Sequence, residues 1–249
     1  MGETTNPAHR QVQHRIRFEW GPTGARAVAA DGGTAVIVDV LSFTTTLTVA
    51  VDAGIEVLPF RWKDERAAAY AAERDAVLAT GRSRRDGVSL SPASVRAATG
   101  VARLVLPSPN GSAISFALAE SGITVVGASL RNASAVARWL VERDQPVAVI
   151  AAGERWPDGS LRPAVEDLWG AGAVLAALVD LGATGLSAEA RATEQAFRAV
   201  VPRLPAELSA CASGAELVDA GFPEDVAIAG ELDDSDVVPL LTGSAFVRA

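Results

Sequence analysis

Short apolar segments alternate with longer amphipathic stretches along most of this chain. The apolar segments are rich in valine, isoleucine, leucine and alanine and are bounded by polar or turn-forming residues, which is typical of buried strands. The predicted strands are Arg15–Trp20, Ala35–Val40, Ile55–Phe60, Ala76–Thr80, Arg103–Pro107, Thr124–Ala128, Val147–Ala151, Val226–Ala229 and Val237–Leu241.

The stretches between these segments repeat apolar residues at helical spacing. Apolar strands that alternate with amphipathic helices predict an α/β fold, layered α/β/α around a mixed, mostly parallel sheet, in one lobe or two. Residues 1–15 are predicted to be a polar N-terminal tail and 16–249 a single α/β domain. At the boundary between them, Arg15–Trp20 alternates polar and apolar residues like an edge strand. The predicted helices are Thr45–Ala53, Glu65–Arg74, Ser112–Ser121, Ala133–Arg143, Val165–Leu181, Ser187–Val200 and Ala212–Ala220.

Composition narrows the class of protein. Apolar residues make up 49% of the chain, which excludes a disordered protein, and the net charge of -8 disfavours a nucleic-acid partner. No apolar run has the length of a membrane span, and the polar first residues lack the hydrophobic segment of a secretory signal. We therefore expect a cytoplasmic protein with no membrane partner.

Few residue types are available for catalysis. Cys211 is the sole cysteine, and His9 and His14, both in the polar first stretch, are the only histidines. These counts exclude a cysteine zinc site and a Ser-His-Asp hydrolase. The sequence also lacks a GxxxxGK[ST] phosphate loop. Carboxylates, hydroxyls and arginines must then supply any acid–base or metal chemistry.

Polar residues gather where predicted strands end, and ligands of α/β sheets bind at the carboxyl ends of strands. An acid that closes an apolar strand, as Asp39 does, costs several kcal/mol of desolvation unless a cation or hydrogen bonds compensate. The other candidates each have an ordinary alternative as a helix cap or as a complement to the helix dipole. They are Ser42, Thr44, Thr45, Thr46, Asn110, Gly111, Ser112, Asn132, Glu154, Glu166 and Asp167.

Together these residues fit the binding of a phosphate and a metal ion. Helix N-termini that carry small hydroxyl residues and Gly111 offer backbone N–H groups to an anion. Several carboxylates at one sheet edge suit Mg²⁺. Arg82, Arg84 and Arg85 lie in a long loop, Gly81–Pro92, and either bind an anion bidentately or form a solvated run of charge. We expect this loop to cover the site.

The order of the motifs resembles one family, the 2-phosphosulfolactate phosphatases of coenzyme M biosynthesis. The matching stretches are VDVLSFTTT at 38–46, GRS at 81–83, LSP at 90–92, PSPNGS at 107–112, GASLRNASAVA at 127–137, AAG at 151–153, AVED at 164–167 and GAELVDAGFPEDVAIAGELDDSDVVP at 214–239. Their order and spacing match the family pattern from about Thr34 to Pro239.

The resemblance implies a Mg²⁺-dependent phosphatase that acts on a sulfonated hydroxy acid. It covers eight candidate residues, namely Asp39, Thr44, Thr45, Asn110, Gly111, Asn132, Glu166 and Asp167. The chain departs from the pattern where Ser42 replaces arginine, Arg82 replaces glutamate and Leu90 replaces asparagine. Such departures leave two alternatives open: a phosphatase for another phosphorylated hydroxy acid, and a non-catalytic anion-binding protein.

These inferences assign the following roles. Asp39, Glu166 and Asp167 are the predicted catalytic and metal-binding residues, for Mg²⁺, and both direct attack by water and an aspartyl phosphate on Asp39 stay open. The predicted partner is a small phosphorylated anion, and we expect a homodimer. The predicted phosphate- and substrate-binding residues are Thr44, Thr45, Arg82, Asn110, Gly111, Ser112 and Asn132.

Overall fold

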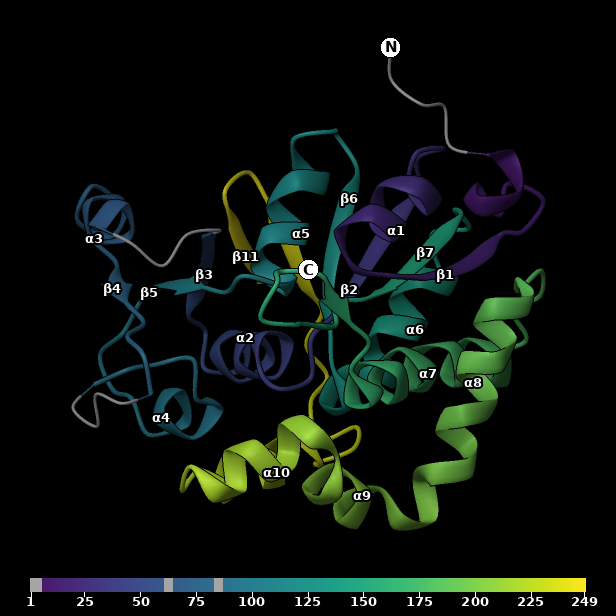
Figure 1. The fold of residues 1–249 in the computed structure, drawn as a ribbon. Coiled ribbons are helices and arrows are strands. Elements are labelled where there is room, and N and C mark those ends of the chain that lie inside the picture. Colours follow the sequence, from purple (N-terminus) through teal and green to yellow (C-terminus); the bar gives the residue numbers. More distant parts are fainter. Residues whose placement is uncertain (1–5, 61–64, 83–86) are drawn as a thin grey trace.

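The computed structural model describes residues 6–60, 65–82 and 87–249. Nine of its described strands join into one sheet of order β1-β7-β2-β6-β10-β11-β3-β5-β4 (Figure 1). These strands are β1 (Ile16–Trp20), β2 (Thr34–Val38), β3 (Glu56–Phe60), β4 (Val77–Leu78), β5 (Arg103–Pro107), β6 (Thr124–Ala128), β7 (Val147–Ala151), β10 (Pro239–Thr242) and β11 (Ala245–Arg248). The separate hairpin is β8 (Glu154–Arg155) and β9 (Leu161–Arg162).

The sheet consists of two parallel groups joined by a hairpin. Strands β1, β7, β2 and β6 pair in parallel, and so do β3, β5 and β4. The C-terminal hairpin β10–β11 bridges the groups through antiparallel pairs with β6 and β3. The predicted mixed, mostly parallel sheet is confirmed, and β1 lies at its edge as its alternating pattern indicated.

Helices cover both faces of the β2 group (Figure 1). The helices are α1 (Gly21–Val28), α2 (Phe43–Asp52), α3 (Glu65–Ala72), α4 (Pro92–Arg96), α5 (Gly111–Ala119), α6 (Ala133–Val141), α7 (Val165–Asp180), α8 (Ala188–Val200), α9 (Leu204–Ala210), α10 (Ala212–Asp219) and α11 (Pro223–Ala229). Short 3₁₀ turns are η1 (Pro7–Arg10), η2 (Leu130–Asn132) and η3 (Val201–Arg203). Among the described helices, none is long and apolar enough to cross a membrane.

Strand β2 explains why the strands in the centre of the sheet carry apolar residues at consecutive positions. Val36 and Val38 pack into the core beneath α6, α7 and α8, whereas Ala35 and Ile37 pack into the core beneath α1 and α5. Side chains on a strand point alternately to the two faces. Because both faces are covered by helices, every β2 residue is buried, and the α/β/α layering follows.

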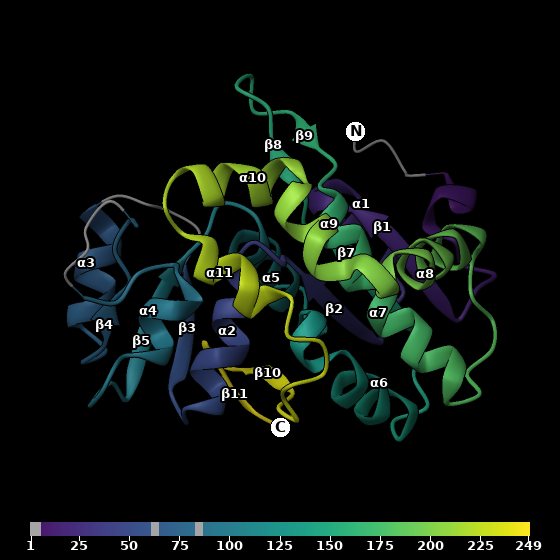
Figure 2. The same cartoon turned by 90° about the horizontal axis from the view of Figure 1, so that it is seen from below.

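The C-terminal region differs from the sequence prediction. Val226–Ala229, predicted as a strand, is the second half of helix α11. Pro223 stands in the first turn of α11, followed by two acids, Glu224 and Asp225. Proline and acidic residues favour the first turn of a helix. A short apolar run such as Val226–Ala229 fits a strand or a buried helix equally well, so these first-turn residues decide for the helix. Helices α9 to α11 pack against one another in front of α2 and α7 (Figure 2).

The polar start of the chain contacts β1. After the 3₁₀ turn η1, the buried Gln11 side chain donates to the Phe18 carbonyl at 2.8 Å and accepts from the Phe18 N–H at 3.2 Å. These hydrogen bonds give partners to the backbone C=O and N–H of Phe18 in β1, the edge strand of the sheet. Unpaired backbone groups on an edge strand would otherwise invite pairing with another chain.

Candidate active site

Asp39 stands directly beyond β2, where two helices begin. Its Oδ1 accepts the Phe43 N–H of α2 at 3.1 Å, and its Oδ2 accepts the Gly111 N–H of α5 at 2.8 Å. Both donors belong to first turns, whose N–H groups have no partner within their helices. A side chain at position 111 would bring a Cβ to 2.8 Å from Asp39 Oδ2 and 2.6 Å from the Phe43 ring. Glycine is therefore required for this close approach.

Two further acids enter from the first turn of α7. Asp167 accepts the Val40 N–H at 2.7 Å through Oδ1 and the Gly153 N–H at 2.8 Å through Oδ2. It thereby joins the ends of β2 and β7. Its neighbour Glu166 is 2% exposed. Glu166 Oε2 has no hydrogen-bond partner among the described residues, so a buried acceptor is left for something else to satisfy.

Glu154 is the fourth carboxylate of this cluster. It follows β7, is half-buried, and its Oε2 accepts a hydrogen bond from Asn110 Nδ2 at 2.9 Å. Glu154 and Asn110 both line a cleft of about 260 Å³. The cleft is closed by Trp20 of β1 and Leu161 of the β8–β9 hairpin. Of the four acids, Glu154 is the one that lines this cleft.

Burial and mutual repulsion work against ionisation of these acids. Burial raises the pKa of Asp39, and the charge of Glu166 adds to this, while hydrogen bonds from Gly111 and Phe43 oppose it. Burial also raises the pKa of Asp167, with further increases from Asp39 and Glu166. The pKa of Glu154 rises to about 7, mainly through burial and then through the charge of Asp39. A bound cation would relieve the repulsion.

The donor set fits one type of metal site. Within the described part of the chain, no three His, Cys, Asp or Glu side chains are arranged as a ready set of metal ligands. Mg²⁺ does not need such a set, because it is usually held by one or two carboxylates, several waters and substrate phosphate. The unpartnered Glu166 Oε2 beside Asp39 and Asp167 supplies hard oxygen ligands of the type that Mg²⁺ prefers.

Three predicted hydroxyl residues bond to the backbone. Thr44 Oγ1 donates to the Asp39 carbonyl at 2.8 Å, and Thr45 Oγ1 donates to the Val40 carbonyl at 2.7 Å. Ser112 Oγ donates to the Phe60 carbonyl at 3.1 Å. These bonds close the β2–α2 turn and attach α5 to β3. Contact between these three residues and substrate stays a prediction.

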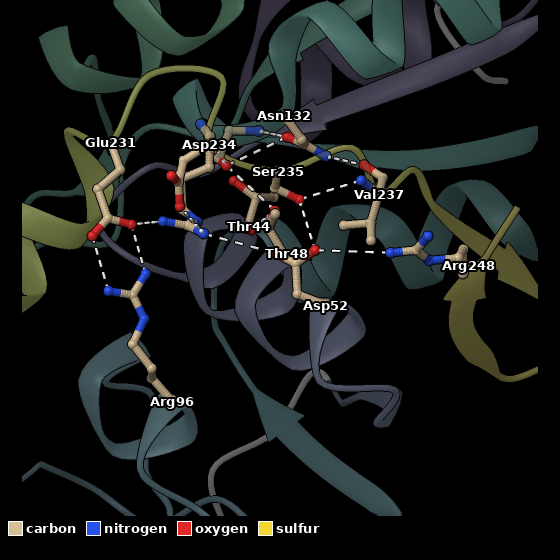
Figure 3. A network of polar contacts seen from close by, with 12 residues as sticks. Thr44, Thr48, Asp52, Arg96, Asn132, Glu231, Asp234, Ser235, Val237 and Arg248 are labelled. Atoms are coloured by element: carbon tan, nitrogen blue, oxygen red, sulfur yellow. Dashed lines mark hydrogen bonds and ion pairs between the residues drawn. The ribbon is translucent and has the colours of Figure 1, made fainter.

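Asn132 also bonds to the backbone, at the end of β6. Its Oδ1 accepts the Ser129 N–H at 2.8 Å, and its Nδ2 donates to the Gly127 and Val237 carbonyls. Figure 3 shows Asn132 beside Val237, on the side of α2 that carries Thr48 and Asp52. Its amide fastens the C-terminal segment to β6, and a contact with substrate stays a prediction.

Arg82 lies in an ion pair beside the site. Its Nε donates to Asp225 Oδ2 at 2.9 Å, and its Nη2 donates to Ser42 Oγ at 2.6 Å and to the Leu90 carbonyl. The guanidinium thus stands against the side chain of position 42. Arg84 and Arg85 lie outside the described residues, as does the central part of the loop predicted to cover the site.

Two residues of this neighbourhood were not among the predicted site residues. Glu154 was noted at a strand end, and the position of β7 beside β2 in the sheet is what brings it to Asp39. Asp225 lies far along the chain, is buried, and also accepts from Ser91 Oγ and the Ala93 N–H. Asp225 lies within the stretch 214–239 that matches the family pattern, and this match could have pointed to it. Its ion pair could not be predicted, because the partner Arg82 lies 143 residues away.

Fold and site together define an α/β protein with an acidic cluster at the carboxyl ends of parallel strands. The profile of the 2-phosphosulpholactate phosphatase family matches residues 23–244. A "Probable 2-phosphosulfolactate phosphatase" of Thermus thermophilus is 33% identical over 214 residues, 84% of this chain and 87% of that protein. A protein of the same description from Deinococcus radiodurans is 30% identical over 217 residues, 83% of this chain and 87% of its own length. The chain belongs to the 2-phosphosulfolactate phosphatase family.

Proposed function

We propose that this chain is a Mg²⁺-dependent phosphatase that hydrolyses a small anionic phosphate monoester, 2-phosphosulfolactate or a closely similar phosphorylated hydroxy acid. The observation that carries the proposal is the cluster of Asp39, Glu166 and Asp167, with the buried Glu166 Oε2 unpartnered among the described residues. Membership of the family supports the substrate class.

The roles follow from the positions of the residues. Asp39, Glu166 and Asp167 would hold Mg²⁺, which when bound neutralises charge on the phosphoryl oxygens. The start of α5, from Asn110 to Ser112, would bind those oxygens, because the N-terminus of a helix attracts anions.

Two threonines would fix the shape of the binding site, and one arginine would supply its positive charge. Thr44 and Thr45 would hold the β2–α2 turn in the geometry that places Asp39. Arg82 would supply the positive charge for the second anionic group of the substrate, next to Ser42.

An alternative is a non-catalytic protein that binds the same anions. The observation that favours it is the ion pair of Arg82 with Asp225, which occupies the guanidinium at a position where the family pattern has an acid. Release of inorganic phosphate from a panel of phosphorylated hydroxy acids, with and without Mg²⁺, tests the two.

We expect Mg²⁺-dependent phosphate release, with 2-phosphosulfolactate among the best substrates. Thermal stabilisation by these esters with no release from any of them would support the binding protein instead, because a ligand stabilises the folded state that binds it.

A further inference from the structure

Glu154 stands between the proposed phosphate-binding turn and the open cleft. Asn110, the residue that precedes α5, donates to Glu154 Oε2 at 2.9 Å, and the next residue, Gly111, donates to Asp39. A phosphoryl group at the start of α5 would therefore have Asp39 on one side and Glu154 on the other.

The exposure of Glu154 distinguishes it from the other acids. Asp39, Glu166 and Asp167 are buried, whereas Glu154 is half-buried and lines the cleft with Asn110. The walls contributed by Trp20, Ala152 and Leu161 are largely apolar. Such a cleft has room for the alcohol part of a small ester, with its bridging oxygen beside Glu154.

We infer that Glu154 is the general acid of the reaction and protonates the bridging oxygen of the ester as it leaves. This assignment rests on the proposed phosphatase function. As the P–O bond to the alcohol breaks, its electron pair goes to the bridging oxygen, which takes the proton of the Glu154 carboxyl group. Water forms the new P–O bond, and a proton from that water or from solvent restores Glu154. The products are the free alcohol and inorganic phosphate.

Burial and the charges around Glu154 favour its protonated form in the metal-free protein. Burial, Asp39 and Glu166 raise its pKa to about 7, while the Asn110 hydrogen bond and Arg162, its cross-strand partner, oppose the rise. Asp167 is also close enough to interact. On the same strand, Arg155 donates to the Pro109 and Gly159 carbonyls. A general acid works best when its pKa lies near the working pH.

The substitution Glu154→Gln tests the role directly. Glutamine keeps an oxygen that can accept from Asn110 but has no acidic proton. The purified proteins are compared in Mg²⁺ buffer on 2-phosphosulfolactate, whose alkoxide leaves poorly, and on p-nitrophenyl phosphate, whose phenolate leaves without a proton.

We expect the variant to lose kcat on the alkyl ester on the order of 100-fold or more, with little change in KM or in its activity on the aryl ester. The matched control is Glu142→Gln, an exposed glutamate at the end of α6, which should behave as wild type on both esters. A second measurement needs no variant: in the wild type, kcat/KM for the alkyl ester should fall as pH rises and the Glu154 carboxyl group loses its proton, and the aryl ester should show no such fall.

Several results would overturn the assignment. Equal losses on both esters in Glu154→Gln, or no loss on either, would remove Glu154 as the proton donor while leaving the phosphatase function intact. The same holds for wild-type pH profiles that are identical for the two esters. If the wild type releases no phosphate from either ester, the proposed function itself fails, and the role of Glu154 fails with it.

Discussion

At the scale of single residues, the four acids of the cluster are stabilised in different ways. Asp39 and Asp167 each accept two backbone N–H groups, so the fold itself supplies partners for both oxygens of each. Glu154 has one side-chain donor, Asn110, and Glu166 has an oxygen without a partner among the described residues. Asp39 and Asp167 therefore fix the turns and keep one further lone pair on each oxygen for a metal ion, while Glu154 and Glu166 are less fully hydrogen-bonded.

The raised pKa of Glu154 predicts a pH-dependent difference in stability. Between the ordinary pKa of 4.5 and the folded value of about 7, Glu154 is protonated in the folded protein and ionised in the unfolded chain. Unfolding then releases a proton, so the free energy of unfolding falls as pH rises through this window. In metal-free buffer we expect Glu154→Gln to be more stable than wild type at pH 8 by about 1–3 kcal/mol, after allowance for partial exposure, and to lose this advantage near pH 4.5.

Urea unfolding at a series of pH values measures the difference. Asp39 and Asp167, whose pKa values are also raised, are present in both proteins, so comparison with the variant reports Glu154 together with the effect of its charge on Asp167. Glu142→Gln, at an exposed position, is the matched control for the loss of one carboxyl group. A constant difference for Glu154→Gln across the same range would contradict the raised pKa.

At the scale of elements, strands that are buried on both faces could be predicted most closely. The limits of β5, β6 and β7 agree with the prediction, because an apolar run bounded by polar residues leaves little choice of ends. The short α11 was predicted wrongly as a strand. Helix α1 was not predicted at all: its Gly-Pro-Thr-Gly start contains the residues that usually mark turns.

In the candidate site too, features set by the local sequence could be predicted, whereas contacts between distant segments could not. Asp39, Gly111, Glu166 and Asp167 could be found because each stands next to a strand or helix end. The bond from Asn132 to the Val237 carbonyl could not be found, because these residues lie 105 positions apart and only the folded chain brings them together.

The start of α5 depends on the absence of a side chain at position 111. We expect Gly111→Ala to destabilise the fold by about 1–3 kcal/mol, as overpacking does, since the new methyl group would contact Asp39 and Phe43 at less than 3.0 Å. Because Asp39 must move, activity should fall by more than the loss of stability explains. Thermal unfolding and phosphate release measure the two effects.

Gly230→Ala is the matched control, because Gly230 has negative φ and its nearest neighbour is the end of the Leu208 side chain at 3.3 Å. We expect that control to retain wild-type activity. Gly111→Ala with full activity and stability would show that the contact between α5 and Asp39 is looser than described.

At the scale of the whole molecule, one buried arginine fastens the C-terminal segment to the sheet. Arg131 of η2, whose side chain is 4% exposed, forms ion pairs with Asp52 of α2 and with Glu231 and Asp234 beyond α11. Figure 3 shows these three acids together, with Arg96 on Glu231 and Arg248 near Asp52. Segments far apart in the sequence are held at one point by this network.

Removal of this cation should therefore destabilise the whole fold. We expect Arg131→Leu to lower the free energy of unfolding by about 2–4 kcal/mol, because acids that faced the guanidinium lose a buried partner, although partial solvent exposure of the acids limits the loss. The control Arg138→Leu removes an exposed pair with Asp236 and should cost less than about 1 kcal/mol. Equal effects in urea unfolding would contradict the role assigned to Arg131.

In the proposed function, phosphate ester hydrolysis takes place at the acidic cluster around Asp39. The most direct test is kcat/KM for 2-phosphosulfolactate, measured with Mg²⁺ for the wild type and for Asp39→Asn, with thermal unfolding to verify that the variant is folded. We predict Mg²⁺-dependent phosphate release by the wild type and a loss on the order of 100-fold or more in the variant, comparable to removal of a single group that stabilises the transition state. Unchanged turnover in a folded Asp39→Asn protein would contradict the account.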